Sequence, residues 1–176
     1  MITPRLETER LILRPLKITD AQVAYDNWTS DPDVSKYMRW NTNKSVEETK
    51  TWLTGASASI HSDKAYDWGI ELKEIDELIG SSAMYVRNDE GVFELGYCIM
   101  KKYWGMGLAT EVAQAMVNFA INELGQKKLF AVHEKKNPAS GKVLEKVGFI
   151  YQSDGTDKSF DGTRTLINRE YILTVE

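Results

Sequence analysis

The sequence predicts an α/β (α+β) fold with a mixed, mostly antiparallel sheet of about seven strands and helices on both faces. Segments with strand and helix patterns follow one another in the order β-α-α-β-β-β-α-β-α-β-β. Short turns join the three central strands, which favours antiparallel neighbours, whereas a long helix separates the third of them from the next strand, as a parallel crossover requires. A chain of 176 residues is expected to form one domain over residues 1–176.

The predicted strands are rich in β-branched and aromatic residues or alternate between apolar and polar positions. They cover residues 10–16, 66–73, 78–86, 92–100, 129–132, 149–152 and 166–175. Turns rich in charged residues or glycine separate the central strands, at residues 74–77 and 87–91. Residues 153–162 are polar and predict a loop.

The predicted helices begin at recognisable caps. They cover residues 19–28, 45–62, 108–124 and 137–147. Thr19 and Ser45 are each followed three residues later by Gln or Glu, which is the spacing of a capping box. Asn137-Pro138 combines a good N-cap with a proline that suits the first helical position. Residues 34–42 predict an aromatic loop or a short helix.

The composition argues against several classes of partner. The net charge of −4 provides no basic footprint, so binding to nucleic acid is not expected. No apolar run reaches membrane-spanning length and no signal-peptide core is present, so no membrane association is expected and a cytoplasmic location is the default. Cys98 is the one cysteine, and His61 and His133 are the only histidines, so neither a disulfide nor a metal site is predicted.

The turn at residues 103–110 connects a predicted strand to a predicted helix and contains Gly105 and Gly107. Such a turn leaves backbone N–H groups without helical partners at the positive end of the helix dipole, which suits an anion and most often a phosphate. The turn lacks the Gly-Lys-Ser/Thr of a Walker A loop, and Thr110 stands where a dinucleotide fingerprint has its third glycine. By itself the turn predicts either a phosphate cradle or a plain turn.

Three separated segments together carry a resemblance to a known family. The first is Thr8–Pro15, which reads TERLILRP. The second is Glu94–Glu111, which contains ELGY and YWGMGLATE, and the third is Asn137–Phe149, which contains NPAS and LEKVGF. With these segments the chain resembles the GNAT superfamily of N-acetyltransferases, in the branch similar to ribosomal-protein N-terminal (alanine/serine) acetyltransferases. Many family members have Arg or Gln at the position of Trp104, and Trp is usual in this branch.

The resemblance implies the acyl-CoA N-acyltransferase fold, with acetyl-CoA as cosubstrate in a splayed parallel strand pair. The pyrophosphate would lie on the glycine turn, and the pantetheine arm would pair with backbone near Ile99 and Met100. The residues implied in cofactor binding are Ile99, Met100, Trp104, Gly105, Met106, Gly107, Leu108, Ala109, Thr110, Asn137, Ser140 and Lys142.

The resemblance also implies direct transfer of acetyl from the thioester to an amine, and two residues are candidates for catalysis. Ser140 would hydrogen-bond or protonate the sulfur, although a serine in a first helical turn can simply satisfy backbone N–H groups. Glu94 would act as the base, because partial burial raises a carboxylate pKa toward the working range. The alternative for Glu94 is an ion pair with a neighbouring Lys or Arg, and Glu71 is its rival as base.

The residues that bind the amine acceptor are the hardest to predict from the sequence. Residues expected to bind the acceptor are Trp28, Tyr37, Trp40 and Glu71. The best-known acceptor of the branch is a protein N-terminal α-amine, and a small amine such as a polyamine, an aminoglycoside or an amino acid derivative is the alternative. A non-catalytic acyl-CoA-binding sensor is the rival class, because a fold does not by itself establish a function. A monomer or a homodimer is expected.

Overall fold

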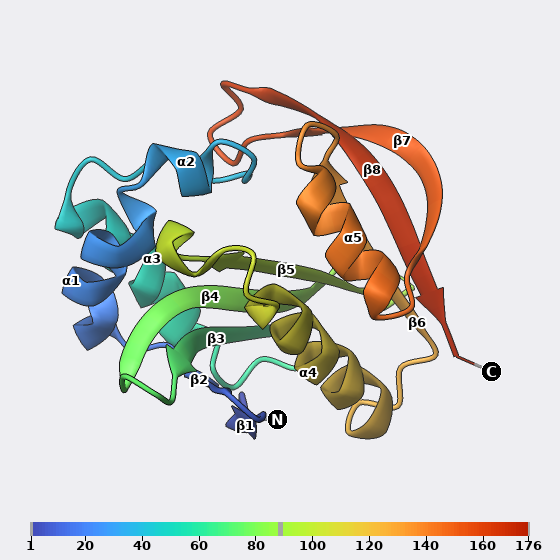
Figure 1. The fold of residues 1–176 in the computed structure, drawn as a ribbon, viewed down its shortest axis with the longest axis horizontal. Helices are drawn as coiled ribbons and strands as arrows, with labels where there is room; N and C mark the ends of the chain where they lie inside the picture. Colours follow the sequence, from blue (N-terminus) through green and yellow to red (C-terminus); the bar gives the residue numbers. More distant parts are fainter. Residues whose placement is uncertain (1, 88–89, 176) are drawn as a thin grey trace.

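The computed structural model describes residues 2–87 and 90–175, and one β-sheet runs through this part of the chain. Eight strands lie in the order β1-β2-β3-β4-β5-β6-β8-β7, and all neighbours are antiparallel except the parallel pair β5 and β6 (Figure 1). The strands are β1 (Leu6–Glu7), β2 (Leu11–Pro15), β3 (Ala65–Leu72), β4 (Glu77–Val86), β5 (Phe93–Ile99), β6 (Lys128–Glu134), β7 (Ile150–Lys158) and β8 (Thr165–Thr174). The predicted mixed, mostly antiparallel sheet is confirmed, with the two-residue β1 in addition.

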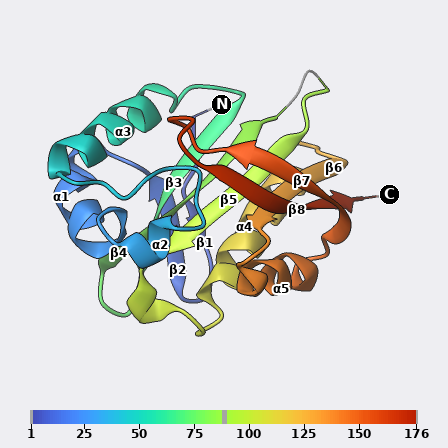
Figure 2. The ribbon, with the colours of Figure 1, turned by 90° about the horizontal axis from the view of Figure 1, so that it is seen from above.

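Helices lie on both faces of the sheet, as predicted. They are α1 (Ala21–Ala24), α2 (Pro32–Ser35), α3 (Val46–Ala58), α4 (Leu108–Asn122) and α5 (Pro138–Lys146). The helices α4 and α5 cover one face, and α1, α2 and α3 lie on the other (Figure 1, Figure 2). A 3-10 turn precedes α1, a π turn follows it, and a second 3-10 turn at Lys101–Tyr103 lies between β5 and α4.

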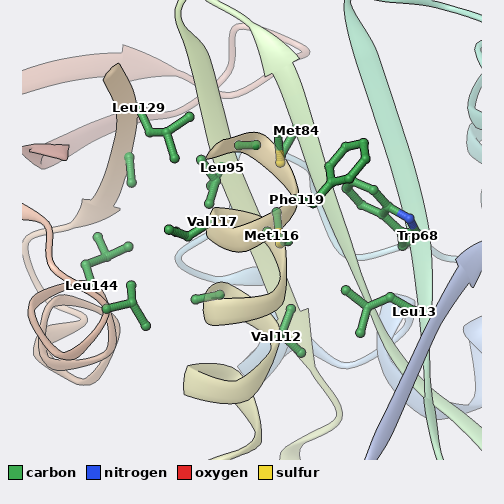
Figure 3. Packing of buried hydrophobic residues seen from close by; sticks show 14 of the residues in the cluster. Leu13, Trp68, Met84, Leu95, Val112, Met116, Val117, Phe119, Leu129 and Leu144 are labelled. Carbon is green, nitrogen blue, oxygen red and sulfur yellow. The ribbon is translucent and has the colours of Figure 1, made fainter. Parts of the chain in front are cut away.

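The larger core lies between α4 and the sheet, because the apolar residues of this helix recur at helical spacing. Val112, Met116 and Phe119 are buried and point toward the strands (Figure 3). The ring of Phe119 meets the ring of Trp68 edge-on, with 5.7 Å between centroids. Full burial of such side chains stabilises by about 1.5–3 kcal/mol each, so this packing holds α4, and the turn at its start, firmly against the sheet.

The opposite face of the central strands carries small side chains. Ala83 of β4 lies between Asp67 of β3 and Gly96 of β5, and Ser81 of β4 lies opposite Cys98 of β5. Cross-strand partners share a face of the sheet, so these residues form one surface beneath α1–α3. A methyl group added at Gly96 would have no atom within 4 Å, which means that the space above it is open.

The parallel strands β5 and β6 diverge. They share only the pairs Phe93–Leu129, Glu94–Phe130 and Leu95–Ala131. Beyond them, β5 continues beside β4 to Ile99, and β6 continues beside β8 to Glu134. The sheet therefore opens between the two strands, and α5 follows directly after β6 at this opening.

Two predicted features near the N-terminus had different outcomes. The cap predicted at Thr19 is wrong, because the first turn begins at Ile18 and the Asp20 carboxylate accepts a hydrogen bond from the Lys17 N–H at 2.8 Å. The N-cap is thus Lys17, and Asp20 is also held by Arg14, a contact that no local pattern reveals. The cap at Ser45 is confirmed, since its hydroxyl accepts from the N–H of Glu48.

The predicted loop at residues 153–162 is also wrong, because β7 continues through most of it to Lys158. This strand lies at the edge of the sheet, so it needs no apolar face and reads as polar sequence. Its pairing with β8 supplies the order, for example at Gly155–Asn168 and Thr156–Ile167. A loop or a short helix was predicted for residues 34–42. The helix α2 ends at Ser35, and residues 36–42 form a loop. The predicted turn at 87–91 includes residues 88 and 89, which lie outside the described residues.

Gly141 allows α5 to approach β6 closely, which gives a first test. An alanine methyl group there would lie 2.7 Å from His133 Nε2 and 3.0 Å from Tyr171 Oη, so Gly141→Ala must displace either the helix or these two buried side chains. We expect a loss of about 1–3 kcal/mol in the free energy of unfolding, measured by urea denaturation. Gly55→Ala in α3 is the matched control, because its methyl group would contact nothing and alanine favours a helix by about 1 kcal/mol. Equal effects of the two substitutions would contradict the close approach.

Candidate active site

The glycine turn has the geometry of an anion cradle. Gly105 and Gly107 have φ angles of +75° and +79°, which L side chains rarely adopt. Gly107 is the N-cap of α4 and offers no capping side chain, and the Glu111 N–H makes the first helical bond to the Gly107 carbonyl. The N–H groups of Leu108 and the next two residues therefore have no partner within the helix.

A charged network, missed in the sequence, holds this turn against the N-terminal strand. The Arg10 guanidinium donates to the Met106 carbonyl at 2.9 Å and to the Glu111 carboxylate at 2.8 Å. Glu111 also accepts from the Thr8 hydroxyl and from the Arg10 backbone. Burial would raise the pKa of Glu111, but the hydrogen bonds from Thr8 and Arg10 lower it below its usual value. Two of the segments that carried the resemblance are thus in direct contact.

The free edge of β5 lies where β6 has diverged. The Met100 N–H donates to the Ile79 carbonyl of β4, so by the alternation of an antiparallel ladder Tyr97 and Ile99 direct their backbone groups away from β4. These are the groups that face the opening. The Trp104 indole N–H donates to the Ile99 carbonyl at 2.7 Å, which ties the half-exposed Trp104 to the end of this edge.

The start of α5 faces the same opening. The Ser140 hydroxyl lies 3.2 Å from the Tyr97 hydroxyl of β5. Burial raises the pKa of Tyr97 to about 12, so this phenol stays protonated and can donate to Ser140. Asn137 caps the helix by position, although its side chain makes no capping hydrogen bond. Lys142 is exposed on the same helix.

A cavity of about 530 Å³ joins the opening to the face beneath α1–α3. Its floor is the surface of small residues on β3, β4 and β5. Aromatic side chains form one wall, and the end of β6 with the start of α5 forms another. Its polar groups come from several elements. The lining includes Trp28, Tyr37, Met38, Arg39, Trp40, Trp52, Asp67, Ser81, Ala83, Tyr85, Glu94, Gly96, Tyr97, His133, Glu134, Asn137, Ser140, Phe160 and Asn168.

The structure brings six of the predicted site residues to this cavity, and Ile99 and Met100 are not among them. Those that line it are Trp28, Tyr37, Trp40, Glu94, Asn137 and Ser140. Glu71 does not line it, because Glu71 forms an ion pair with Arg14, which is itself paired with Asp20. The turn residues and Lys142 lie outside the lining.

Glu94 lines the cavity and also forms an ion pair with Arg87. Its side chain is only 6% exposed, and its carboxylate accepts from the Tyr85 hydroxyl at 2.9 Å and from Arg87 at 2.7 Å. The Arg87 guanidinium stacks on the Phe130 ring at 3.7 Å, which fixes its position. Burial raises the pKa of Glu94, and the charge of Arg87 opposes this shift. The ion pair predicted as the alternative for Glu94 is therefore present, and the same carboxylate also lines the cavity, as a base must.

Asp67 is a further carboxylate in the cavity, beside Glu94 and Glu134, and the sequence analysis did not select it. It accepts a hydrogen bond from the Ser59 hydroxyl at 2.9 Å, and burial raises its pKa. Among residues 2–87 and 90–175, no Lys or Arg forms an ion pair with it. The alternation along β3, in which Trp68 faces α4, was the one available signal that Asp67 faces the other way.

A strap of two segments far apart in sequence crosses the cavity beside α2. Arg164, after the tip of the β7–β8 hairpin, donates to the carbonyls of Lys36, Met38 and Trp40 and to the Asn41 side chain. The Phe160 N–H donates to the Arg39 carbonyl, and both of these residues line the cavity. Residues 36–41 and 158–164 are called the strap below.

The thiol of Cys98 and the imidazole of His133 are buried and hydrogen-bonded to neighbouring protein groups. Cys98 is buried with its Sγ 3.4 Å from the Ser81 hydroxyl, and burial raises the pKa of its thiol. His133 lies between the Glu134 carbonyl and the Tyr171 hydroxyl, and burial lowers its pKa. In the part of the chain that the structure describes, no three His, Cys, Asp or Glu side chains form a group able to hold a metal ion. Nor is any helix there long and apolar enough to cross a membrane.

Comparisons with known proteins agree with this geometry. Residues 10–150 match the model of the acetyltransferase (GNAT) domain. The sequence is 30% identical to the uncharacterized N-acetyltransferase p20 of Bacillus licheniformis, over 94% of this chain and 97% of that protein. It is also 30% identical to the uncharacterized N-acetyltransferase YoaA of Bacillus subtilis, over 89% of this chain and 88% of that one. The chain therefore belongs to the GNAT family and is an N-acetyltransferase.

Solved structures with low sequence identity share the fold. A Vibrio cholerae protein named a "putative ribosomal-protein-serine acetyltransferase" superposes with a TM-score of 0.86 at 18% identity, over 99% of this chain and 100% of that one. The microcin C7 self-immunity acetyltransferase MccE, solved with acetyl-CoA and AMP, gives 0.81 at 13% identity, over 96% and 94%. Spermidine N-acetyltransferase from Vibrio cholerae, solved with CoA and spermine, gives 0.77 at 17% identity, over 95% and 96%.

The network around Arg10 predicts a selective effect on the cosubstrate. Arg10→Gln removes a charged hydrogen bond to the Met106 carbonyl inside the turn. We expect KM for acetyl-CoA to rise about tenfold, from the loss of roughly 1.5 kcal/mol, with a smaller change in KM for the amine. Steady-state kinetics with each substrate varied in turn measures this.

Arg5→Gln is the matched control, because the ion pair that Arg5 forms within the described residues is with the exposed Glu7, two residues further along the chain. The two variants should differ clearly in KM for acetyl-CoA. Similar values would show that Arg10 does not position the turn.

Proposed function

We propose that this protein transfers the acetyl group of acetyl-CoA directly to a primary amine, with a protein N-terminal α-amine of the ribosomal type as the leading acceptor. One observation carries the proposal. A single cavity passes through the opening between β5 and β6 and is lined by Ser140 and Asn137 at one side and by Glu94 and Asp67 at the other. A thioester and an amine that enter from opposite faces of the sheet would meet inside it.

The cosubstrate side fits coenzyme A. The unpartnered N–H groups at the start of α4 suit the pyrophosphate, and the free backbone edge at Tyr97 and the Ile99 N–H suits the amide groups of the pantetheine arm. Ser140 would lie near the sulfur. Because Tyr97 can donate to the Ser140 oxygen, the serine proton is free to hydrogen-bond the departing thiolate.

The amine side needs a proton acceptor. The amine arrives mainly as an ammonium ion, and only the neutral amine attacks the thioester carbon, after which the carbon–sulfur bond breaks and the thiolate takes up a proton. Glu94 is the candidate base, acting directly or through water, because its raised pKa brings it closer to the working range. Its ion pair with Arg87 limits that shift.

Two acceptor classes remain in the proposal. The overall superposition on the Vibrio cholerae protein named for ribosomal-protein-serine acetylation accords with a protein N-terminus. A small amine is favoured by the strap, which encloses part of the cavity, and by the carboxylates on its floor. A peptide N-terminus would enter beside the strap with its following residues outside.

A thiol-release assay tests the proposal. The protein is mixed with acetyl-CoA and a panel of acceptors: short peptides with N-terminal Ala or Ser, polyamines, aminoglycosides and amino acid derivatives. Release of thiol that depends on the amine, with a mass increase of one acetyl group on that amine, is the expected result. Acetyl-CoA binding without turnover of any member would instead favour an acyl-CoA sensor.

The pH dependence of the reaction tests Glu94. Burial raises the pKa of Glu94, so if the carboxylate is the base, activity is lost as the pH falls through a pKa above the usual carboxylate range. Arg87→Gln removes the opposing charge and should move this acidic limb of kcat/KM to higher pH. Glu94→Gln should remove the limb. An acidic limb that survives Glu94→Gln at the same pH assigns the proton transfer to another group.

A further inference from the structure

We propose that the acceptor cavity contains a second cation subsite, in which Asp67 binds a positively charged group of the acceptor other than the reacting amine. This inference rests on the proposed function, because it specifies which amines that function serves. It does not require a choice between a peptide and a small molecule. The ligand chemistry is an acceptor with two cationic groups.

Asp67 differs in its partners from Glu94 and Glu71. Glu134, which also lines the cavity, accepts a hydrogen bond from the Lys136 N–H at 2.9 Å. Glu94 is neutralised by Arg87, and Glu71 by Arg14. Within the described residues, the side-chain partner of Asp67 is the neutral Ser59 hydroxyl. A carboxylate held in a largely apolar cavity without a counter-ion is destabilised in its charged form, and a cation that arrives there relieves this cost.

The register of the sheet sets the distance between the two cation sites. Asp67 lies opposite Ala83, and Ala83 lies opposite Gly96, at the edge where β6 has diverged. Two strand spacings separate Asp67 from Gly96, which is about 10 Å. The reacting amine must lie near that opening, so Asp67 is too far away to contact it and close enough to contact a group a few bonds along the same molecule.

The walls near Asp67 suit a cation with an apolar body. Trp52 lies on α3 seven residues before Ser59, which places both on one face of the helix, and Trp52 lines the cavity with Trp28. Indole rings stabilise cations by about 0.5–2 kcal/mol. The Arg39 side chain is the guanidinium of the lining, and it is already bound to the Lys158 carbonyl and stacked on Phe160 at 4.8 Å.

The test compares acceptors that differ only in a second charge. Hexamethylenediamine is compared with hexylamine, and the peptide Ser-Lys-Ala with Ser-Met-Ala, in the wild-type protein and in Asp67→Asn. The asparagine keeps the shape and can still accept from Ser59. Glu74→Gln is the control variant, because it removes one negative charge from the exposed β3–β4 turn, outside the cavity.

We expect the wild-type protein to prefer the doubly charged member of at least one pair by about tenfold in kcat/KM, as for a close charge pair in a partly desolvated site. Asp67→Asn should abolish this preference while changing kcat/KM for the singly charged member by less than about threefold, and Glu74→Gln should keep it. A preference confined to the diamine pair identifies a small amine. One confined to the peptide pair identifies a basic side chain that follows the N-terminus.

Two results would overturn the inference. One is the absence of any preference in the wild-type protein, and the other is an equal loss with both members of a pair in Asp67→Asn, which would give Asp67 a structural or catalytic role. If no acceptor is turned over, the proposed function fails, and the subsite is judged by tryptophan fluorescence with the CoA-loaded protein. Hexamethylenediamine should then change the emission at concentrations at which hexylamine does not, and Asp67→Asn should remove the difference. Identical titrations would refute the subsite.

Discussion

The divergence of β5 and β6 is the constraint on which the rest of the structure depends. Only three residue pairs join these strands, and α4 packs against the sheet beside them. The opening frees the backbone of Tyr97 and the Ile99 N–H, admits the start of α5 beside it, and connects the two faces of the sheet. A sheet with a continuous β5–β6 ladder would have the same core but no passage between a thioester on one face and an amine on the other.

The two carboxylates Glu94 and Asp67 of the cavity have different electrostatic surroundings. Glu94 is held between Tyr85 and Arg87, so its charge is balanced within the protein and its proton affinity is adjusted by two opposing effects. Asp67 has no such balance, and its charge is available to a ligand. Two carboxylates on one surface thus differ through a single neighbouring guanidinium. The apolar walls strengthen both effects, because they lower the local dielectric.

Local patterns in the sequence predicted the elements whose causes are local. Ser45 caps α3 through its own hydroxyl, and Gly105 and Gly107 adopt the conformations that a tight turn requires. Features that depend on long-range contacts could not be read in the same way. Asp20 holds the backbone of the N-cap Lys17 and is itself held by Arg14, β7 is ordered by its pairing with β8, and Asp67 belongs to the cavity because of its register with β4. The strap was also invisible, since Arg164 reaches Met38 across 126 positions of sequence.

The position of β8 in the sheet has a consequence for the order in which the molecule is made. The last strand of the chain lies between β6 and β7, so β7 has no neighbour in the sheet until β8 has been synthesised (Figure 1). The glycine turn, β5 and α4 can already form on a chain that is still attached to the ribosome. The strap over the cavity cannot, because Arg164 and β8 follow all the other strands in the sequence. The glycine turn therefore precedes the strap during biosynthesis, and the cavity is completed only after β8 has been synthesised.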